Sequence, residues 1–185
     1  INQNDILNLE LLNIIDYNYI FDENPIKRIK TKPTLENSKS RLKSLENKIK
    51  AIENCNLKKN ASKIVFSDGN IQSPIMIVGE GPGQKEDELG KPFVGDAGNL
   101  LNKMLKAINI KRDKIYITNV VNYRPPNNRK PEPSEINRYS EFLKEHISII
   151  DPKILILMGS TAMEAILGSN KRISIERGQW KEVII

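Results

Sequence analysis

The sequence has few of the residues that mark several classes of protein. It contains one cysteine, Cys55, so it cannot form an internal disulfide, and a reducing cytoplasm is the expected location. No apolar run approaches the roughly 18–20 residues that cross a bilayer, and the N-terminus lacks the basic start and apolar core of a signal peptide. With 38% hydrophobic and 28% charged residues among 185, a soluble globular protein without a membrane partner is expected.

Histidine is equally scarce, and the charge is moderately basic. The one histidine, His146, follows a helical pattern beside Leu143, Ile147 and Ile150, which predicts a structural role. The formal net charge of +6 is compatible with a polyanionic partner. Most lysines are nevertheless expected to form an ordinary solvated surface. The charge alone therefore does not identify a partner.

Apolar segments of two kinds alternate from Ile75 onward. Short segments of apolar, β-branched or aromatic residues are typical of buried strands; they occur at 75–78, 115–118 and 154–158, and a fourth strand is expected to begin at 180–185. Helical spacing occupies the segments between them, at 97–108, 134–150 and 160–167, and Ser134 is the expected N-cap of the second. The alternation predicts an α/β fold, a three-layer α/β/α sandwich with a four-stranded parallel sheet.

The part of the chain before the sheet is predicted to contain helices. Residues 5–21 have a partly helical apolar pattern, and 22–33 is a polar stretch with two prolines that indicates a linker. Thr34 then opens a helix that runs to about Ile52. We therefore divide the chain into an N-terminal helix and linker, 1–33, and one domain, 34–185.

The predicted sheet locates a site before any family is considered. In open parallel sheets ligands bind beyond the carboxyl ends of the strands. The segments that leave those ends are Gly79–Gly83, Asn119–Arg129 and Gly159–Thr161. We therefore expect these three segments to converge.

The first of these segments is rich in glycine, so phosphate-binding loops have to be considered. A dinucleotide fingerprint starting at Gly79 needs glycine where the chain has Gln84, and Pro82 removes an amide donor. The lysine of a P-loop is missing, and Glu80 would repel phosphate. The glycines indicate either a tight turn or a backbone that approaches a flat ligand closely.

Other residues near the strand ends also admit two interpretations. Phe93, in a loop between proline and glycine, packs in the core or faces a ligand. Asn119 ends a strand, where it forms a turn or offers its amide. Arg124 and Arg129 lie on a proline-stiffened loop from which they would contact phosphates.

Three longer motifs together resemble one family. They are Gly-Glu-Gly-Pro-Gly with Glu-Asp downstream, Gly-Lys-Pro-Phe-Val-Gly-Asp-Ala-Gly-Asn-Leu-Leu, and Tyr-Ile-Thr-Asn-Val-Val-Asn-Tyr-Arg-Pro-Pro-Asn-Asn-Arg. In this order and spacing they resemble family 4 uracil-DNA glycosylases, the thermostable iron–sulfur type, from about Cys55 to Trp180. A bacterial variant of that family is expected.

The resemblance implies roles for the residues at the strand ends. A flipped uracil would stack on Phe93 and pair through N3–H and O4 with Asn119, which distinguishes it from cytosine. Glu86 would lie near C5 and exclude the thymine methyl. The catalytic residues would be Glu80, which positions water or stabilises the oxocarbenium-like sugar, and Asn119. The expected uracil-binding residues are Gly79, Glu80, Gly81, Pro82, Glu86, Phe93 and Asn119, and the expected DNA-binding residues are Arg124, Arg129 and Ser160.

Two features depart from the family that the chain resembles. Its members hold an iron–sulfur cluster on four cysteines, but the matching positions here are Cys55, Lys58, Tyr123 and Tyr139. We therefore expect no cluster, no metal and no other cofactor. The family also uses a His-Pro motif after the fourth strand, and the chain ends at Ile185 before that loop, so an incomplete and nearly inactive domain is expected.

Three functions remain open from the sequence. The first is a monomeric uracil-DNA glycosylase that acts on uracil-containing DNA to start base-excision repair. The second is a catalytically incomplete module that binds uracil-containing or abasic DNA. The third is a nucleotide-binding α/β enzyme, which the absent phosphate-loop patterns disfavour.

Overall fold

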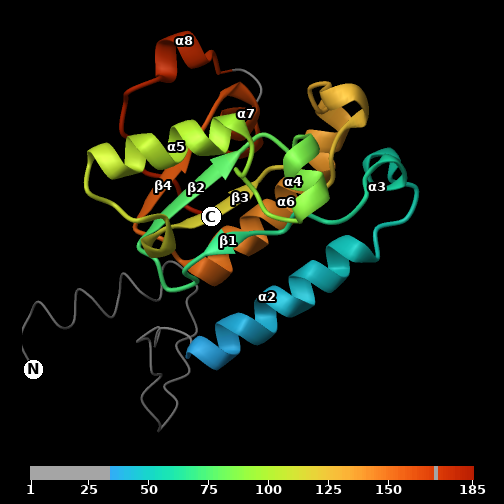
Figure 1. The fold of residues 1–185 in the computed structure, drawn as a ribbon, viewed down its shortest axis with the longest axis horizontal. Coiled ribbons are helices and arrows are strands. Elements are labelled where there is room, and N and C mark those ends of the chain that lie inside the picture. The colour runs from blue at the N-terminus through green and yellow to red at the C-terminus, as the bar shows by residue number, and fades with distance from the viewer. Residues whose placement is uncertain (1–33, 169–170) are drawn as a thin grey trace, which may run out of the picture. The chain divides into compact units, whose positions relative to one another are not determined.

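The centre of the fold is a sheet whose strands follow the order β1-β3-β2-β4 (Figure 1). The computed structural model describes residues 34–168 and 171–185. Three parallel strands occupy the apolar runs that the sequence predicts: β2 (Ile75–Gly79), β3 (Tyr116–Asn119) and β4 (Ile154–Leu157). Because β2 and β3 pair in register, Gly79 lies beside Asn119 at the carboxyl edge. This pairing brings the first two predicted loops together.

The fourth strand is not where the sequence predicts it, and the sheet is mixed rather than parallel. It is β1 (Asp68–Gly69), which pairs antiparallel with β3. Its two residues are typical of a turn, so no apolar pattern reveals them. Gly69 has φ 100°, and a Cβ there would lie 2.0 Å from the Ile115 carbonyl oxygen. Residues 180–185 form no strand, because no described strand pairs with this segment. Trp180, at its start, is 84% exposed.

Helices cover both faces of the sheet, which confirms the three layers (Figure 1). Alternating strand residues point to opposite faces. Ile77 and Ile117 pack with Leu101 and Leu105 of α5 (Asp96–Ala107). Met76, Val78 and Tyr116 join the larger core formed with three helices, α2 (Leu35–Lys50), α6 (Pro133–Ile150) and α7 (Ser160–Leu167).

The starts of two helices test the predicted caps. The Thr34 hydroxyl accepts a hydrogen bond from the Asn37 N–H and caps α2, at the residue where the sequence predicts the helix to begin. The predicted Ser134 cap of α6 is wrong, because the N-cap is Glu132, which forms a capping box with Glu135. Pro133, whose fixed φ suits the first helical position, follows that cap.

The remaining elements are short, and they connect the layers. They are α3 (Asn56–Asn60), α4 (Gln84–Leu89), α8 (Ile173–Glu176), η1 (Arg112–Lys114) and η2 (Pro126–Asn128). The helix predicted at 5–21 and the linker at 22–33 lie outside the described residues. Among the helices that are described, none has the length and apolar composition needed to cross a membrane.

Candidate active site

A pocket of about 380 Å³ lies at the carboxyl edge of the sheet. It is lined by Gly79, Glu80, Gly81, Gly83, Glu86, Phe93, Gly95, Asp96, Ala97, Asn119 and Met158. Glu80, Phe93 and Asn119 therefore share one cavity, as the sequence predicts. Pro82 is buried beside the pocket rather than lining it.

Gly79 makes room for the two side chains that face it. A Cβ at this position would lie 2.5 Å from Asn119 Oδ1 and 2.6 Å from the edge of the Phe93 ring. Both distances are far below van der Waals contact, so any other residue would displace one of these groups. The glycine is therefore required by the close approach of these two side chains. Close approach of its backbone to a flat ligand, the alternative given from the sequence, stays a prediction.

The Asn119 side chain offers a hydrogen-bond acceptor and a donor to this pocket. The residue is 3% exposed and ends β3. Within the part of the chain that the structure describes, no protein group bonds to its side-chain amide, and no polar side-chain atom is sealed off without a partner. A buried amide is normally satisfied by protein or ordered water. The arrangement therefore suits a ring that presents an N–H beside a carbonyl.

Phe93 lies in the loop between α4 and α5 with an unusual backbone. Its φ is 53°, in the left-handed region, and its ring is half-buried against the pocket. Holding a bulky residue there costs on the order of 1–3 kcal/mol. Such conformations persist where surrounding contacts enforce them, and they gather at ligand sites. The ring lines the pocket and also packs against the core that contains Ile77 and Leu101, so the structure supports both interpretations of Phe93.

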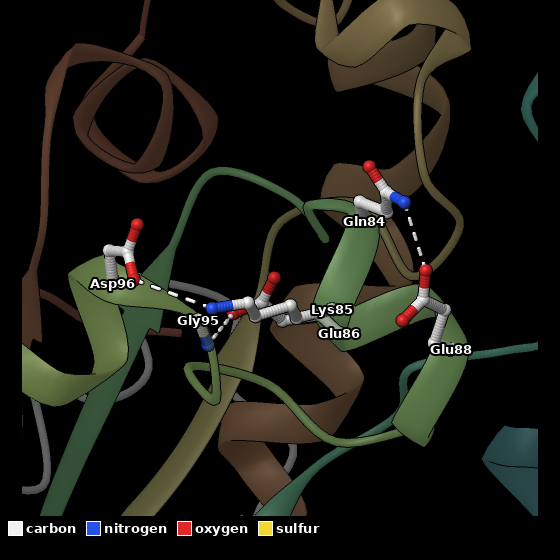
Figure 2. A pocket seen from close by; sticks show the side chains of 6 residues that line it. All are labelled: Gln84, Lys85, Glu86, Glu88, Gly95 and Asp96. Carbon is white, nitrogen blue, oxygen red and sulfur yellow. Dashed lines mark hydrogen bonds and ion pairs between the residues drawn. The ribbon is translucent and has the colours of Figure 1, made fainter.

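Glu86 holds the same loop from the pocket side. Its Oε1 accepts hydrogen bonds from the backbone N–H groups of Val94, at 2.9 Å, and Gly95, at 2.8 Å. Figure 2 shows the carboxylate of Glu86 reaching from α4 toward Gly95 at the start of α5. The neighbouring Asp87 anchors α4 by accepting the N–H groups of Ser62 and Lys63.

Glu80 is held by a residue to which the sequence analysis assigns no role. The Thr161 hydroxyl, fully buried near the start of α7, donates to Glu80 Oε2 at 2.5 Å. Thr161 thus fixes one carboxylate oxygen at the mouth of the pocket. The third predicted segment therefore converges with the first. The only feature of the sequence that pointed to Thr161 was its position just after the end of a strand.

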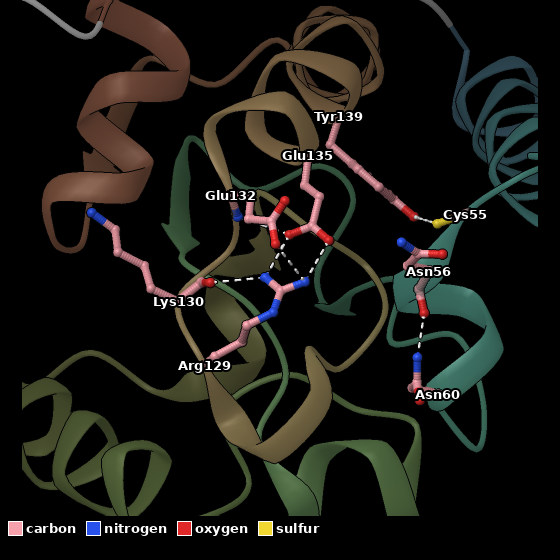
Figure 3. A network of polar contacts seen from close by, with 8 residues as sticks. All are labelled: Cys55, Asn56, Asn60, Arg129, Lys130, Glu132, Glu135 and Tyr139. Atoms are coloured by element: carbon pink, nitrogen blue, oxygen red, sulfur yellow. Dashed lines mark hydrogen bonds and ion pairs between the residues drawn. The ribbon is translucent and has the colours of Figure 1, made fainter.

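The three residues predicted to contact DNA differ in the hydrogen bonds that they already make to other protein groups. Arg129 forms a bidentate salt bridge with Glu135, in which both hydrogen bonds are 2.8 Å long (Figure 3). This hydrogen bond is the main cause that holds the pKa of Glu135 below its usual range. Within the described ranges, Arg124 bonds only to Asn128, at 2.8 Å, and Ser160 accepts a longer hydrogen bond of 3.4 Å from Lys130. Lys130 is a cation at this face that the sequence did not single out.

The four positions that match the family's cluster ligands do not fit a cluster. The Cys55 thiol lies 3.5 Å from the Tyr139 hydroxyl, and Tyr123 packs in the same core (Figure 3). Burial raises the pKa of both tyrosines, so their phenols stay protonated. The Lys58 ammonium donates to the carbonyls of Lys50 and Ile52 at the end of α2. In the described residues no three His, Cys, Asp or Glu side chains gather as metal ligands.

His146 has the structural role that its pattern predicts. It is 2% exposed, its ring stacks on Phe66 with centroids 4.6 Å apart, and its Nε2 lies 2.7 Å from the Tyr116 hydroxyl. Burial lowers the pKa of His146 to about 3, so the ring is neutral at pH 7. It belongs to the core between β3 and α6, not to the pocket.

The fold and pocket agree with a comparison of the sequence with known families. A sequence model of the Uracil DNA glycosylase superfamily matches residues 66–185. The match includes the whole sheet and every residue that lines the pocket. The chain belongs to the uracil-DNA glycosylase superfamily.

Individual relatives narrow the likeness to one branch. The chain is 42% identical over 130 residues to the type-4 uracil-DNA glycosylase of Thermotoga maritima, covering 70% of this chain and 67% of that protein. It is 40% identical over 148 residues to the type-4 enzyme of Sulfurisphaera tokodaii, covering 76% and 67%. For the type-4 enzyme of Archaeoglobus fulgidus the values are 39% over 125 residues, covering 68% and 63%. The chain thus spans about two thirds of the length of these relatives.

Proposed function

We propose that the protein is a uracil-DNA glycosylase, which hydrolyses the bond between uracil and deoxyribose in DNA and so starts base-excision repair. The observation that carries the proposal is Asn119, a residue only 3% exposed that lines the pocket and whose side-chain amide has no described protein partner. Membership of the superfamily and the similarity to type-4 enzymes support it.

Base recognition follows from the two groups that face Gly79. The uracil ring, flipped out of the duplex, stacks on Phe93, a contact of about 1–3 kcal/mol. Asn119 Oδ1 accepts N3–H while Nδ2 donates to O4. Cytosine presents an acceptor at N3 and a donor at C4, so it opposes both groups. In this proposal Glu86, together with the loop that it holds, closes the pocket on the C5 side and excludes the thymine methyl.

Glu80 carries the hydrolytic step in this proposal. Thr161 holds Oε2, which leaves the other carboxylate oxygen for a water molecule. The bond from C1′ to N1 breaks with its electron pair leaving on uracil, and the water oxygen attacks C1′. Glu80 accepts the proton of that water, and its negative charge stabilises the oxocarbenium-like sugar. The proton held by Glu80 then passes to the uracil anion through solvent, which restores the carboxylate, and the products are free uracil and an abasic site.

The phosphates of the DNA backbone are assigned to the cations beside the pocket. Arg124 and Ser160 with Lys130 are the best placed, because their present partners are an amide and each other. Arg129 retains one exposed edge, but Glu135 already holds both arms of its guanidinium. We therefore assign it a smaller share of DNA binding than the sequence predicts.

We also propose that the protein works without an iron–sulfur cluster, as a monomer in a reducing cytoplasm. The proposal is supported by a single thiol in the sequence and by the protonated phenols around it. Protein purified without oxygen is expected to contain no stoichiometric iron and no broad visible absorbance. About four irons per chain would contradict this part of the proposal.

Excision from matched oligonucleotides tests the function. The protein is expected to release uracil slowly, but not cytosine or thymine, so single-turnover assays use protein in excess over DNA and score abasic sites by alkaline cleavage. Asn119→Asp places an acceptor opposite O4, so uracil excision is expected to fall about 10–100-fold, the equivalent of 1–3 kcal/mol. Multiple turnovers with excess DNA separate an enzyme from a module that only binds.

The matched control is Asn137→Asp, the same chemical change on the exposed surface of α6. It is expected to leave excision unchanged. Equal losses in the two variants would remove Asn119 from the site. Tight binding of uracil-containing DNA without any abasic product would replace the enzyme by the binding module.

A further inference from the structure

The strained loop that carries Phe93 is held by a residue outside the pocket. Arg112, in η1 after α5, donates from Nη2 to the Pro92 carbonyl at 2.7 Å and from Nη1 to the Phe93 carbonyl at 3.0 Å. Nη1 also reaches Asn102 Oδ1 on α5, at 3.2 Å. One planar guanidinium thus binds two consecutive carbonyls of the loop and the helix that follows it.

The orientation of Arg112 is itself fixed by the edge of the sheet. Its Nε donates to Asp68 Oδ2 of β1 at 2.9 Å, and both side chains are about three-quarters buried. The rigid fork therefore connects β1, the Phe93 loop and α5. A lysine at this position would carry the charge but not the planar set of donors.

The opposite side of the loop is held by an anion. Glu86 accepts the N–H groups of Val94 and of Gly95, the latter shown in Figure 2, while Arg112 binds the two carbonyls immediately before them. Gly98 of α5 packs under the same turn, where a Cβ would lie 2.0 Å from the Phe93 carbonyl oxygen. The backbone of residues 92–95 is therefore fixed from three directions.

We propose that Arg112 is a positioning residue for base binding: it enforces the left-handed backbone of Phe93 and so aims the ring into the pocket. Arg112 does not line the pocket, so it acts through Phe93 and not on the base. Loss of the clamp releases the strain at φ 53° and lets the ring leave its position beside Gly79. The inference rests on the proposed function for its kinetic consequence, but not for its structural one.

The structural consequence is measured in the free protein. With 4-fluorophenylalanine incorporated, the ¹⁹F resonance of Phe93 is assigned by its loss in Phe93→Leu. Arg112→Gln is expected to shift or broaden that resonance and to leave those of Phe66 and Phe142 in place. Amide hydrogen exchange at residues 93–96 is expected to accelerate in the same variant.

The kinetic consequence is measured on uracil-containing DNA. Arg112→Gln is expected to lower kcat/KM on the order of 10²-fold, the scale of a misplacement of about 1 Å, with most of the change in KM because stacking is lost on binding. Arg112→Lys is expected to recover little of it. Asp68→Asn, which keeps the guanidinium but removes the negative charge that orients it, is expected to give a smaller loss, and it carries the test if Arg112→Gln fails to fold.

Arg138 offers a matched control elsewhere in the fold. Its guanidinium also donates to two consecutive carbonyls, those of Glu53 and Asn54, and Asn54 also has a positive φ, 50°. Arg138→Gln removes the same kind of clamp and is expected to change neither the Phe93 resonance nor kcat/KM.

The outcomes separate the inference from the proposed function. An unchanged Phe93 resonance in Arg112→Gln, or equal kinetic losses in Arg112→Gln and Arg138→Gln, would overturn the positioning role. A wild-type chain that excises no uracil would overturn the function, while the ¹⁹F and exchange measurements would still decide whether Arg112 fixes the loop.

Discussion

Two residues of the same short strand, three positions apart, show how differently this protein treats buried polar groups. The Tyr116 hydroxyl donates to Ser67 Oγ and contacts His146 Nε2, at 2.8 and 2.7 Å, and the residue is 1% exposed. Asn119, 3% exposed, has no described protein partner for its amide. We call the first neighbourhood, with Tyr139 and Cys55, the closed core, and the second, with Gly79 and Phe93, the pocket edge. Burial of a polar residue alone therefore does not mark a site, whereas a polar group without a protein partner that opens onto a pocket does.

The largest effect is expected from filling the pocket edge. Gly79→Ala places a methyl group 2.5–2.6 Å from Asn119 and the Phe93 ring, so both groups must move. Uracil excision is expected to fall by roughly 10²–10³, the scale of losing a preorganised catalytic contact, with only a modest change in melting temperature. Single-turnover excision and thermal unfolding measure the two effects.

Gly178→Ala is a control for glycine replacement at this edge. Gly178, unlike Gly79, has a positive φ, 78°, and no described atom lies within 4 Å of its Cβ position. This variant is expected to excise uracil at the wild-type rate. A comparable loss in both variants would show that the effect of Gly79→Ala is not one of space.

The next largest effect is expected in the closed core, where it changes the free energy of unfolding. The folded-state pKa of His146, about 3, lies below the unfolded value of about 6.5. As the pH falls below 6.5 the unfolded chain binds the proton first, so the stability present above pH 6.5 is lost progressively until about pH 3. Urea unfolding between pH 6.5 and 5 is expected to show a loss of about 1.4 kcal/mol per pH unit.

The variant His146→Gln removes the titrating group and keeps a hydrogen-bonding side chain. Its unfolding free energy is expected to change little with pH in the same window. An equal slope in the wild type and in His146→Gln would show that other groups cause the pH dependence.

A smaller effect is expected at the carboxylate that faces the pocket. Thr161→Val removes the hydroxyl that holds Glu80 Oε2 and keeps the shape of the side chain. We expect kcat to fall about tenfold, or 1.4 kcal/mol, with KM unchanged, because Glu80 acts on the chemical step. Thr161→Ser is expected to restore most of the rate, and failure to do so would assign Thr161 a packing role.

The smallest effect is expected where the closed core meets the cluster positions. Tyr139→Phe removes the contact between its hydroxyl and the Cys55 thiol, and we expect a loss of about 0.5–1 kcal/mol in unfolding free energy. Excision should be unchanged, because this core is separate from the residues that line the pocket. A large loss of excision in Tyr139→Phe would contradict the separation of the two regions.

The sequence predicts the parallel strands well because their side chains are apolar on both faces. Each helix assigned after Ile75 was also found, since its spacing is regular over several turns. β1 was missed because Asp68–Gly69 owes its strand geometry to pairing with β3, which no local pattern records. Residues 180–185 were wrongly assigned as a strand for the converse reason. Their sequence suits a strand, but a segment forms a strand only when a neighbouring strand pairs with it.

At the site, the residues at strand ends could be predicted and their supports could not. Gly79, Glu80 and Asn119 follow buried strands directly, so topology places them together. Arg112 and Thr161 act on residues 19–20 and 81 positions away in the sequence. Their partners are backbone carbonyls and a carboxylate that only the folded chain brings near.

The central claim, that the Asn119 amide recognises uracil, is tested most directly by NMR titration with free bases at millimolar concentration. The side-chain amide resonances of Asn119, assigned by their loss in Asn119→Asp, are followed during addition of uracil and of cytosine. The account predicts that uracil shifts the Asn119 Nδ2 resonances and that cytosine does not. Unchanged resonances with uracil, or equal shifts with both bases, would contradict it.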